Sequence, residues 1–376
     1  MAALLREICA PLRVTAVGGG TGLPAVLGGL TRWPGADVTA VVTTCDDGGS
    51  SGRIRKRYGL PSPGDVRNCL VALAPAGNGL AEIFQHRFVG LGGLGGHTVG
   101  NLILAALAQR LGDFGAAVDA ATRLLGARGR VLPSTAERVD LLAELSDGRT
   151  IRGECSIAAA QGRIARLRLQ RPVRAPARAV RAVASADLVV FGPGSLYTSV
   201  IASLLGAGME AALEACRGWR VLVVNLFTQP GETDGHDAAD HVRALQRHFG
   251  PVVDAALIHS RPLPRRMVAA YAAQGARVVR CDRAALASLG VRIIEADLLD
   301  DSNPVRARHD PRKLGKALQT IVRSRRETQP GGQRCAESSA TSGSVKRARS
   351  SSKGCAVSSI AGMTARARPF SSRTGW

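Results

Sequence analysis

Hydrophobic positions follow two patterns that alternate from Arg13 to about Arg326. Short runs rich in Val, Ile and Leu are typical of buried strands, and the Ala- and Leu-rich stretches between them repeat apolar residues at helical spacing. We expect strands at 13–17, 38–43, 188–191, 220–226, 255–259 and 276–279, and helices at 22–30, 65–74, 99–110, 114–125, 195–205, 238–249 and 264–273. This alternation predicts an α/β fold with a doubly wound, mostly parallel, Rossmann-like sheet. Ligands of such sheets bind at the carboxyl ends of the strands.

Residues 129–170 depart from this alternation. The stretches "RVDLLAELSDGRTIRG" and "GRIARLRLQ" alternate apolar and polar residues with a period of two, which is typical of half-buried strands. Asp147-Gly148 is a hairpin-turn dipeptide. We therefore predict a small β-insertion within one nucleotide-binding domain that spans residues 13–326.

The two ends of the chain differ from this domain. Residues 1–12 are expected to be an N-terminal extension, and Arg6 and Glu7 interrupt any apolar region of a signal peptide. Residues 327–376 are rich in Ser, Gly and Arg and show no hydrophobic periodicity, so they cannot bury enough apolar surface to offset chain entropy. We predict a disordered basic tail, either functional or an out-of-frame extension of the coding sequence.

Composition narrows the class of protein. The net charge is +21, but only five of the 50 basic residues are lysine, and this preference for arginine points to a GC-rich coding bias. No base-reading element accompanies the charge, so we expect no specific nucleic-acid binding. The eight cysteines show no C-x-x-C spacing, which favours reduced thiols and argues against zinc. No apolar run approaches the roughly 20 residues of a membrane span. We expect a cytoplasmic protein, and no pattern predicts its oligomeric state.

The first expected strand runs directly into "GGGTGL", residues 18–23, at the start of a helix. Glycines allow the backbone to approach a phosphate, and helix N-terminal amides can bind it. The spacing Gly20-x-Gly22-x-x-Ala25 also fits the dinucleotide fingerprint, with Asp46 near the place of its ribose-binding acid. A plain tight turn is the alternative. The chain has no G-x-x-x-x-G-K-[ST] run, which excludes a P-loop NTPase.

The loop "DDGGSSGRIR", residues 46–55, contains more polar groups than an NAD site needs. Its Gly and Ser amides can form a nest for an anion, and Arg53 and Arg55 can clamp phosphate oxygens. Carboxylates so close to phosphate are favourable where they hold Mg²⁺, bind ribose hydroxyls or orient arginines. A solvated polar loop is the alternative.

Two further loops follow expected strands. Residues 192–195, "GPGS", precede an expected helix, and residues 225–234 contain Thr228 and Gln229. Each is compatible with simple turn chemistry, but three such loops at the strand ends of one sheet predict a shared ligand. His97 and Asn101 form a polar pair at a helix start, either as a structural cap or as a ligand contact.

These motifs together resemble the YvcK/CofD-like family, and within it the YvcK branch, often called gluconeogenesis factor. The matching blocks are GGGTGL, DDGGSSGRIR, PGDVRNCL (63–70), HTVGNL (97–102), GPGSLYTS (192–199), NLFTQPGETDGHDAADHV (225–242) and RHDPRKL (308–314). The YvcK branch is described as binding UDP-sugars such as UDP-N-acetylglucosamine and as needed for cell shape and wall growth on gluconeogenic carbon sources, with no established reaction. The CofD branch is a Mg²⁺-dependent transferase of phospholactate to a deazaflavin.

The resemblance implies roles for individual residues. Asp46 and Asp65 match metal-binding carboxylates of the transferase, and Tyr271 and Arg308 lie where the YvcK branch holds its sugar nucleotide. A tyrosine face can stack on a uracil ring. Departures are Ile201 to Leu205, which read Ile-Ala-Ser-Leu-Leu in place of the usual Ile-Pro-Asn-Leu-Leu, and His236 in place of an aromatic residue. The expected nucleotide-sugar site comprises Gly19, Gly20, Thr21, Gly22, Asp46, Asp47, Gly48, Ser50, Ser51, Arg53, Asn68, His97, Asn101, Gly192, Gly194, Ser195, Thr228, Gln229, Tyr271 and Arg308.

The leading hypothesis is a regulatory UDP-sugar-binding protein that acts on cell-wall precursor supply, with cell-wall or morphogenesis proteins as partners and no assigned catalytic residue. The alternatives are a phospholactyl transferase with Mg²⁺, an NAD dehydrogenase and a nucleic-acid-binding module. The dehydrogenase leaves the loops after 192 and 225 unexplained. The motifs PGDVRN and TQPGETDG follow the YvcK branch.

Overall fold

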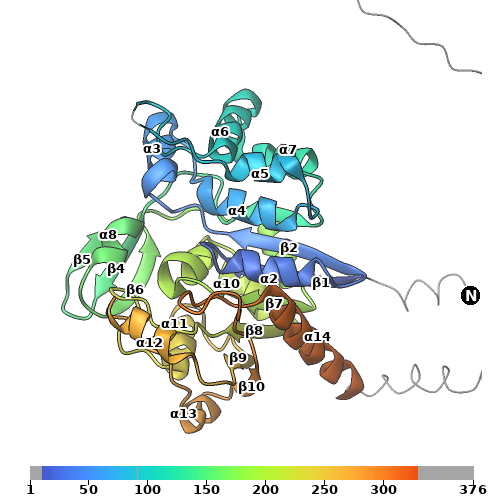
Figure 1. Cartoon of the computed structure of the whole chain (residues 1–376), viewed down its shortest axis with the longest axis vertical. Helices are drawn as coiled ribbons and strands as arrows, with labels where there is room; N and C mark the ends of the chain where they lie inside the picture. Colours follow the sequence, from blue (N-terminus) through green and yellow to red (C-terminus); the bar gives the residue numbers. More distant parts are fainter. Residues whose placement is uncertain (1–10, 91, 329–376) are drawn as a thin grey trace, which may run out of the picture. The chain divides into compact units, whose positions relative to one another are not determined.

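A computed structural model describes residues 11–90 and 92–328. Seven strands form its central sheet in the order β10-β9-β8-β7-β1-β2-β3, and all neighbouring strands are parallel (Figure 1). The predicted α/β fold with a mostly parallel sheet is confirmed. The strands are β1 (Leu12–Gly18), β2 (Ala36–Val42), β3 (Arg130–Pro133), β7 (Leu188–Phe191), β8 (Trp219–Val223), β9 (Ala255–His259) and β10 (Arg292–Ala296).

Helices cover both faces of this sheet, as its alternating side chains require. In β7, Leu188 and Val190 pack into one hydrophobic cluster, and Val189 and Phe191 pack into the other. The first cluster includes α2 (Leu23–Leu30), α4 (Gly64–Leu73), α5 (Gly79–Gln85), α6 (Val99–Leu111), α7 (Phe114–Leu124) and α14 (Pro311–Thr328). The second includes α9 (Ala177–Ala184), α10 (Met209–Ala215), α11 (Ala238–Phe249) and α13 (Arg283–Ser288).

The strand order places a topological switch point between β1 and β7. From β1 the chain moves outward through β2 to β3, and it then returns to β7 on the other side of β1 and continues to β10. Loops that leave two such strands diverge and leave a crevice at their carboxyl ends, where open α/β sheets bind ligands. The loops after β1 and β7 are 18–22 and 192–195, two of the predicted ligand loops.

A second sheet of three antiparallel strands joins β4 (Leu141–Leu145), β5 (Thr150–Arg152) and β6 (Ile164–Leu169) in the order β5-β4-β6, and α8 (Glu154–Ala159) follows β5. This insertion is shorter than the expected 129–170. β3 pairs with β2 in the main sheet, and Val131 to Pro133 are all buried, unlike the half-buried strands of a small insertion.

Several local predictions are wrong. The helix expected at 195–205 is a π-helical turn, η1 (Leu196–Ile201), followed by a 3₁₀ turn, η2 (Ala202–Leu204). The strand expected at 276–279 is reduced to an isolated bridge between Phe227 and Val278. The loop expected after Gly48 is helix α3 (Gly49–Tyr58), in which a Cβ on Gly52 would overlap the Asp47 carbonyl. α13 and β10 were not predicted. In contrast, α12 (Arg265–Ala272) agrees with the helix expected at 264–273.

The chain's two ends are only partly described. The chain divides into Met1–Arg326 and Glu327–Trp376, and α14 continues to Thr328. The rest of the predicted tail, and residues 1–10 of the predicted extension, lie outside the described residues; Pro11 is described, and β1 begins at Leu12. In the described part of the chain, no helix has the length and apolar character that a membrane crossing requires.

Candidate functional site

The three glycine-containing loops contact one another at the switch point. A Cβ on Gly22 would lie 2.7 Å from the carbonyl carbon of Pro193, and one on Gly194 would lie 3.4 Å from the Gly19 oxygen. The Asn225 side chain accepts from the Gly194 amide at 3.0 Å and donates to the Gly194 carbonyl at 2.8 Å. Gln229 Nε2 donates to Ser195 Oγ at 2.9 Å. The loops after β1, β7 and β8 therefore form one continuous surface.

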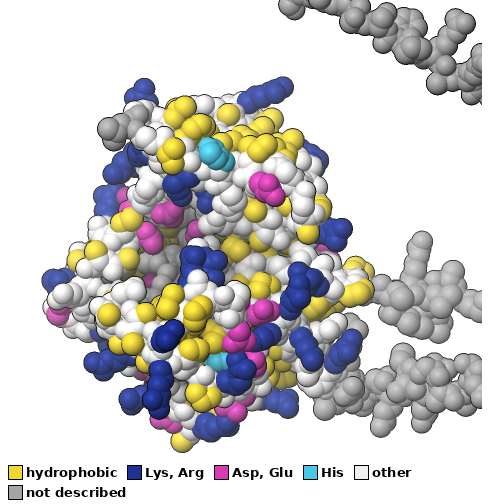
Figure 2. Space-filling model, viewed as in Figure 1, with side chains coloured by type: hydrophobic (Ala, Val, Ile, Leu, Met, Phe, Trp, Pro, Cys, Tyr) yellow, Lys and Arg dark blue, Asp and Glu magenta, His cyan; other side chains and the backbone are white. Residues whose placement is uncertain are grey.

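A cavity of about 410 Å³ opens on this surface, on the hollowed face seen in Figure 2. Its walls come from the three loops, from α12 and from the segment before α14. The lining residues are Thr21, Gly22, Pro24, Ala25, Pro193, Gly194, Asn225, Leu226, Phe227, Thr228, Gln229, Tyr271, Asp300, Ala307, Arg308, His309 and Pro311. This volume is within the range of small-molecule sites.

Tyr271 and Phe227 form the aromatic wall of the cavity. Their rings stack with centroids 4.2 Å apart and an interplanar angle of 21°. The Tyr271 hydroxyl accepts a hydrogen bond from the Ala307 amide at 3.1 Å, which ties α12 to the segment that carries Arg308. One face of the tyrosine ring is thus covered by Phe227, which restricts a stacked ligand to the other face.

Arg308 and His309, at the far wall, differ in charge. The Arg308 side chain is exposed, and among the described residues nothing accepts a hydrogen bond from its guanidinium. His309 is buried beside His259, and burial lowers the pKa of its imidazole to about 4, so it is neutral at pH 7. A free guanidinium that faces a cavity is suited to bidentate binding of phosphate.

The structure divides the predicted site residues into two groups. Thr21, Gly22, Gly194, Thr228, Gln229, Tyr271 and Arg308 line the cavity, and Gly19, Gly20, Gly192 and Ser195 belong to the loops that form it. The second group does not line it: Asp46, Asp47, Gly48, Ser50, Ser51, Arg53, Asn68, His97 and Asn101. Asn225, Phe227 and His309 also line the cavity. Phe227 was not expected to contact a ligand, although its position directly after the strand expected at 220–226 was an available signal.

The helix start after residue 195 is already occupied by a carboxylate of the protein. Glu232 is buried, and its Oε1 accepts from the Tyr197 amide at 2.9 Å and the Thr198 amide at 2.7 Å. Burial raises the pKa of Glu232, and these hydrogen bonds act in the opposite direction. The expectation that this turn offers its helix amides to a ligand anion is therefore wrong at these two amides.

Arg55 does not serve as a phosphate clamp. Its side chain is buried, it forms an ion pair with Asp140 at 2.9 Å, and it donates to the Val139 carbonyl. Asp140 also binds the exposed Arg152 at 2.7 Å. The arginine instead fastens α3 to the chain just before β4.

Asp65 lies beside the first glycine loop, and Asp46 is near enough to act on its charge. Asp65 accepts a hydrogen bond from the Gly20 amide, and a Cβ on Gly19 would overlap its carboxylate. Burial, with a contribution from the Asp46 charge, raises the pKa of Asp65 to about 6. Asp46 accepts from the Gly48 amide at 2.9 Å and from Ser62 Oγ at 3.4 Å. Both carboxylates keep unused oxygen lone pairs, as a hard cation such as Mg²⁺ requires.

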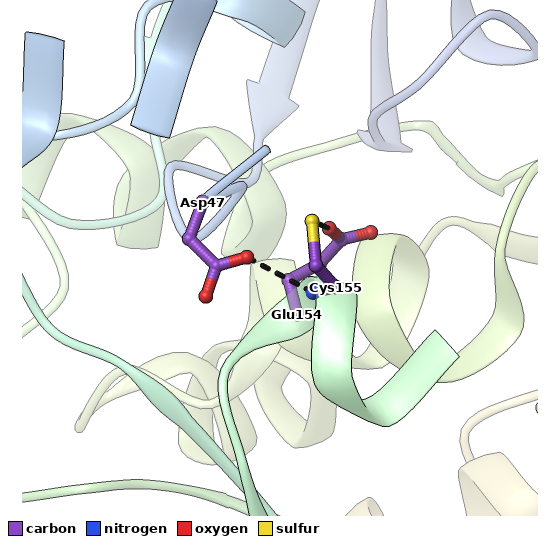
Figure 3. A group of neighbouring side chains, drawn as sticks. All are labelled: Asp47, Glu154 and Cys155. Atoms are coloured by element: carbon purple, nitrogen blue, oxygen red, sulfur yellow. Dashed lines mark hydrogen bonds between the residues drawn. The ribbon is translucent and has the colours of Figure 1, made fainter. Parts of the chain in front are cut away.

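Asp47 contacts the insertion. Figure 3 shows its carboxylate accepting from the Cys155 amide, at 2.9 Å, with Glu154 beside it. Asp47, Glu154 and Cys155 each offer an atom within 4.8 Å of the others. Burial, with the charges of Asp46, Asp47 and Glu232, raises the pKa of Glu154 to about 7. Asp47 therefore connects the loop after β2 to α8 and does not face the cavity.

Comparison with known proteins identifies the family of this chain. The family model of 2-phospho-L-lactate transferase CofD matches residues 14–299. The chain is 41% identical over 307 residues to the gluconeogenesis factor of Halalkalibacterium halodurans, covering 81% of this chain and 95% of the relative. It is 39% identical over 313 residues to the gluconeogenesis factor of Bacillus subtilis, covering 83% and 98%.

A solved structure supports the same assignment. A crystal structure of a UPF0052 family member from Bacillus halodurans matches with a TM-score of 0.79 and 40% identity, covering 82% of this chain and 99% of that one. The family model spans most of the described chain, and the relatives are matched over nearly their whole length. The chain therefore belongs to the CofD/YvcK family.

Proposed function

We propose that this protein binds a UDP-sugar of the UDP-N-acetylglucosamine type in the cavity at the switch point, without converting it. The observation that carries the proposal is the joint placement of Gly22, Gly194, Tyr271 and Arg308 around one cavity of about 410 Å³. Glycine backbone at the strand ends accommodates a diphosphate, the guanidinium supplies charge, and the aromatic wall accommodates a base.

The role of such a binder is regulatory. The relatives in H. halodurans and B. subtilis are named gluconeogenesis factors, and a protein that senses a wall precursor would adjust its supply when carbon enters through gluconeogenesis. We propose the cytoplasm as its location and cell-wall or morphogenesis proteins as its partners. Loss of the protein is then expected to alter cell shape on gluconeogenic carbon sources.

Arg308→Ala is expected to weaken UDP-N-acetylglucosamine binding about 10- to 100-fold, because a hydrogen bond to a charged group contributes about 1.5–3 kcal/mol. Isothermal titration calorimetry of the full chain measures the change. Arg306→Ala is the matched control, since this exposed arginine lies two residues away and does not line the cavity. Equal affinity in wild type and Arg308→Ala would contradict the site.

Tyr271→Phe is expected to weaken the same ligand about fivefold. The variant keeps the ring stacked on Phe227 but loses the acceptor for the Ala307 amide, a hydrogen bond of about 1 kcal/mol that positions the Arg308 segment. Tyr58→Phe, at a ring that is 47% exposed, controls for the general effect of removing a hydroxyl. A Tyr271→Phe affinity equal to wild type would show that this segment is held by other contacts.

A Mg²⁺-dependent phospholactyl transferase is the second candidate, favoured by Asp65 beside Gly20 and by the neighbouring Asp46. The two carboxylates would hold the ion, which would supply positive charge to a donor phosphate. The test is product formation from a nucleotide-activated phospholactate and a deazaflavin, with and without Mg²⁺, in wild type and Asp46→Asn. Turnover that requires Mg²⁺ and Asp46 would replace the regulatory proposal, and no turnover would retire this candidate.

A further inference from the structure

A chain of hydrogen bonds links Arg67 to His97 among residues that do not line the cavity. Arg67 Nη1 donates to Asn101 Oδ1 at 3.1 Å, Asn101 Nδ2 donates to Ser50 Oγ at 3.1 Å, and Ser50 Oγ lies 3.0 Å from His97 Nδ1. The residues come from α4, α6, α3 and the segment before α6, and all four are buried. This series of hydrogen bonds therefore joins three helices through polar side chains.

The direction of these hydrogen bonds favours one tautomer of His97. Guanidinium groups only donate, so Asn101 must present its oxygen to Arg67 and its NH₂ group to Ser50. The Ser50 hydroxyl accepts from Asn101, and among the described residues His97 Nδ1 is the one acceptor within hydrogen-bond distance of it, so its own hydrogen is directed to Nδ1. A neutral histidine whose Nδ1 accepts carries its proton on Nε2. Across residues 11–90 and 92–328, no group hydrogen-bonds this Nε2.

The charges that act on His97 are both positive. Arg53 donates to the Gly95 carbonyl and Arg87 to the Gly96 carbonyl, each at 2.6 Å, so both guanidiniums are fixed within two residues of His97. Burial, followed by the charges of Arg53 and Arg87, lowers the pKa of His97, which keeps the ring neutral at pH 7. Both arginines have exposed side chains and retain free donors.

Arg67 adds a buried positive charge. It is 6% exposed, its Nε has no acceptor, and its bonded partners Thr98, Asn101 and Asn68 are all neutral. In the described chain no carboxylate lies within ion-pair distance of Arg53, Arg67 or Arg87. Asp65 and Asp46 act on Arg67 only from beyond ion-pair distance, so its buried charge is incompletely offset, and a bound anion would stabilise it further.

We propose that His97 Nε2–H, together with the guanidiniums of Arg53 and Arg87, binds a phosphate group at a site separate from the UDP-sugar cavity. A neutral imidazole donor with a fixed tautomer and two forked donors match a tetrahedral oxyanion. Ser50 and Asn101 are positioning residues, since they orient the ring and do not touch the ligand. The site does not depend on the cavity or on what binds there.

The test uses inorganic phosphate and the full chain at constant ionic strength, with and without saturating UDP-N-acetylglucosamine, followed by ¹⁵N–¹H spectra of the histidine rings. We expect His97 to carry its proton on Nε2, and phosphate to shift that signal under both conditions. His97→Ala should weaken phosphate binding at least about tenfold, as should Arg53→Gln combined with Arg87→Gln. His86→Ala, which removes an exposed histidine that lies edge-to-face against Phe88, should bind as wild type.

Ser50→Ala separates positioning from folding. It removes the donor to Nδ1, so the His97 spectrum should change to a mixture of tautomers and phosphate affinity should fall severalfold. His97→Gln retains an N–H donor and should recover part of the binding lost in His97→Ala. The proposal is overturned if wild-type His97 carries its proton on Nδ1, if phosphate leaves its signal unmoved, or if His97→Ala binds phosphate as tightly as wild type.

Discussion

Gly22→Ala is expected to abolish UDP-sugar binding in practice and to destabilise the fold by about 3 kcal/mol. The new methyl group would overlap the Pro193 carbonyl, which is backbone and cannot rotate away, so the loops after β1 and β7 must separate. Gly22 has a φ of −80°, which alanine adopts freely, so the effect is steric only. Separation removes phosphate contacts from both loops, and each lost charge-assisted hydrogen bond weakens binding tenfold or more.

Gly28→Ala is the matched control, inside α2, the helix whose N-cap residue is Gly22. Its Cβ would lie 3.5 Å from Pro311 Cβ, an ordinary contact, and alanine stabilises a helix interior by about 0.5–1 kcal/mol over glycine. Chemical denaturation and calorimetry on both variants make the comparison. If Gly22→Ala kept wild-type affinity and stability, the loops would not form a single rigid surface.

The loops could be predicted from the sequence because their signal is local. A glycine run between a Val-rich strand and a helix constrains the backbone at that place, and parallel strands bring such loops to one edge of the sheet. Thr21, Gly194 and Gln229, which line the cavity, were proposed as site residues in this way. The closeness of the Gly22 and Gly194 loops follows from the switch point, which depends on strand order.

Long-range pairing is what the sequence did not reveal. Arg55 reads as a phosphate ligand beside glycines and serines, but its carboxylate partner, Asp140, is 85 positions away and is brought near by the insertion. Glu232 likewise caps a turn 34 residues earlier in the chain. A short basic or acidic motif does not predict whether its charge faces a ligand or another part of the protein. Only the packing of α3 and of the loop after β8 decides between them.

Acidification provides the second large expected effect, through His241 on α11. This histidine is 1% exposed, and burial, with a smaller contribution from the nearby His236, lowers its pKa to about 4, against about 6.5 in the unfolded chain. The folded state therefore favours the neutral ring. Its contribution is fully present above pH 6.5 and is lost as the pH falls toward 4. The loss amounts to about 2 kcal/mol at pH 5 and about 3 kcal/mol at pH 4.

Replacing the ring isolates this effect from the carboxyls that titrate in the same range with the opposite sign. The raised pKa values of Asp65 and Glu154, about 6 and about 7, make those groups favour the folded state as the pH falls, and they are unchanged in a His241→Leu variant. Relative to wild type, His241→Leu should gain about 2 kcal/mol in free energy of unfolding between pH 7.5 and pH 5, measured by urea denaturation. The exposed His86, replaced by Leu, is the matched control. If the pH profiles of His241→Leu and wild type were parallel, His241 would take up its proton at the same pH in the folded and unfolded chains. That result would mean that water reaches the His241 ring in the folded protein.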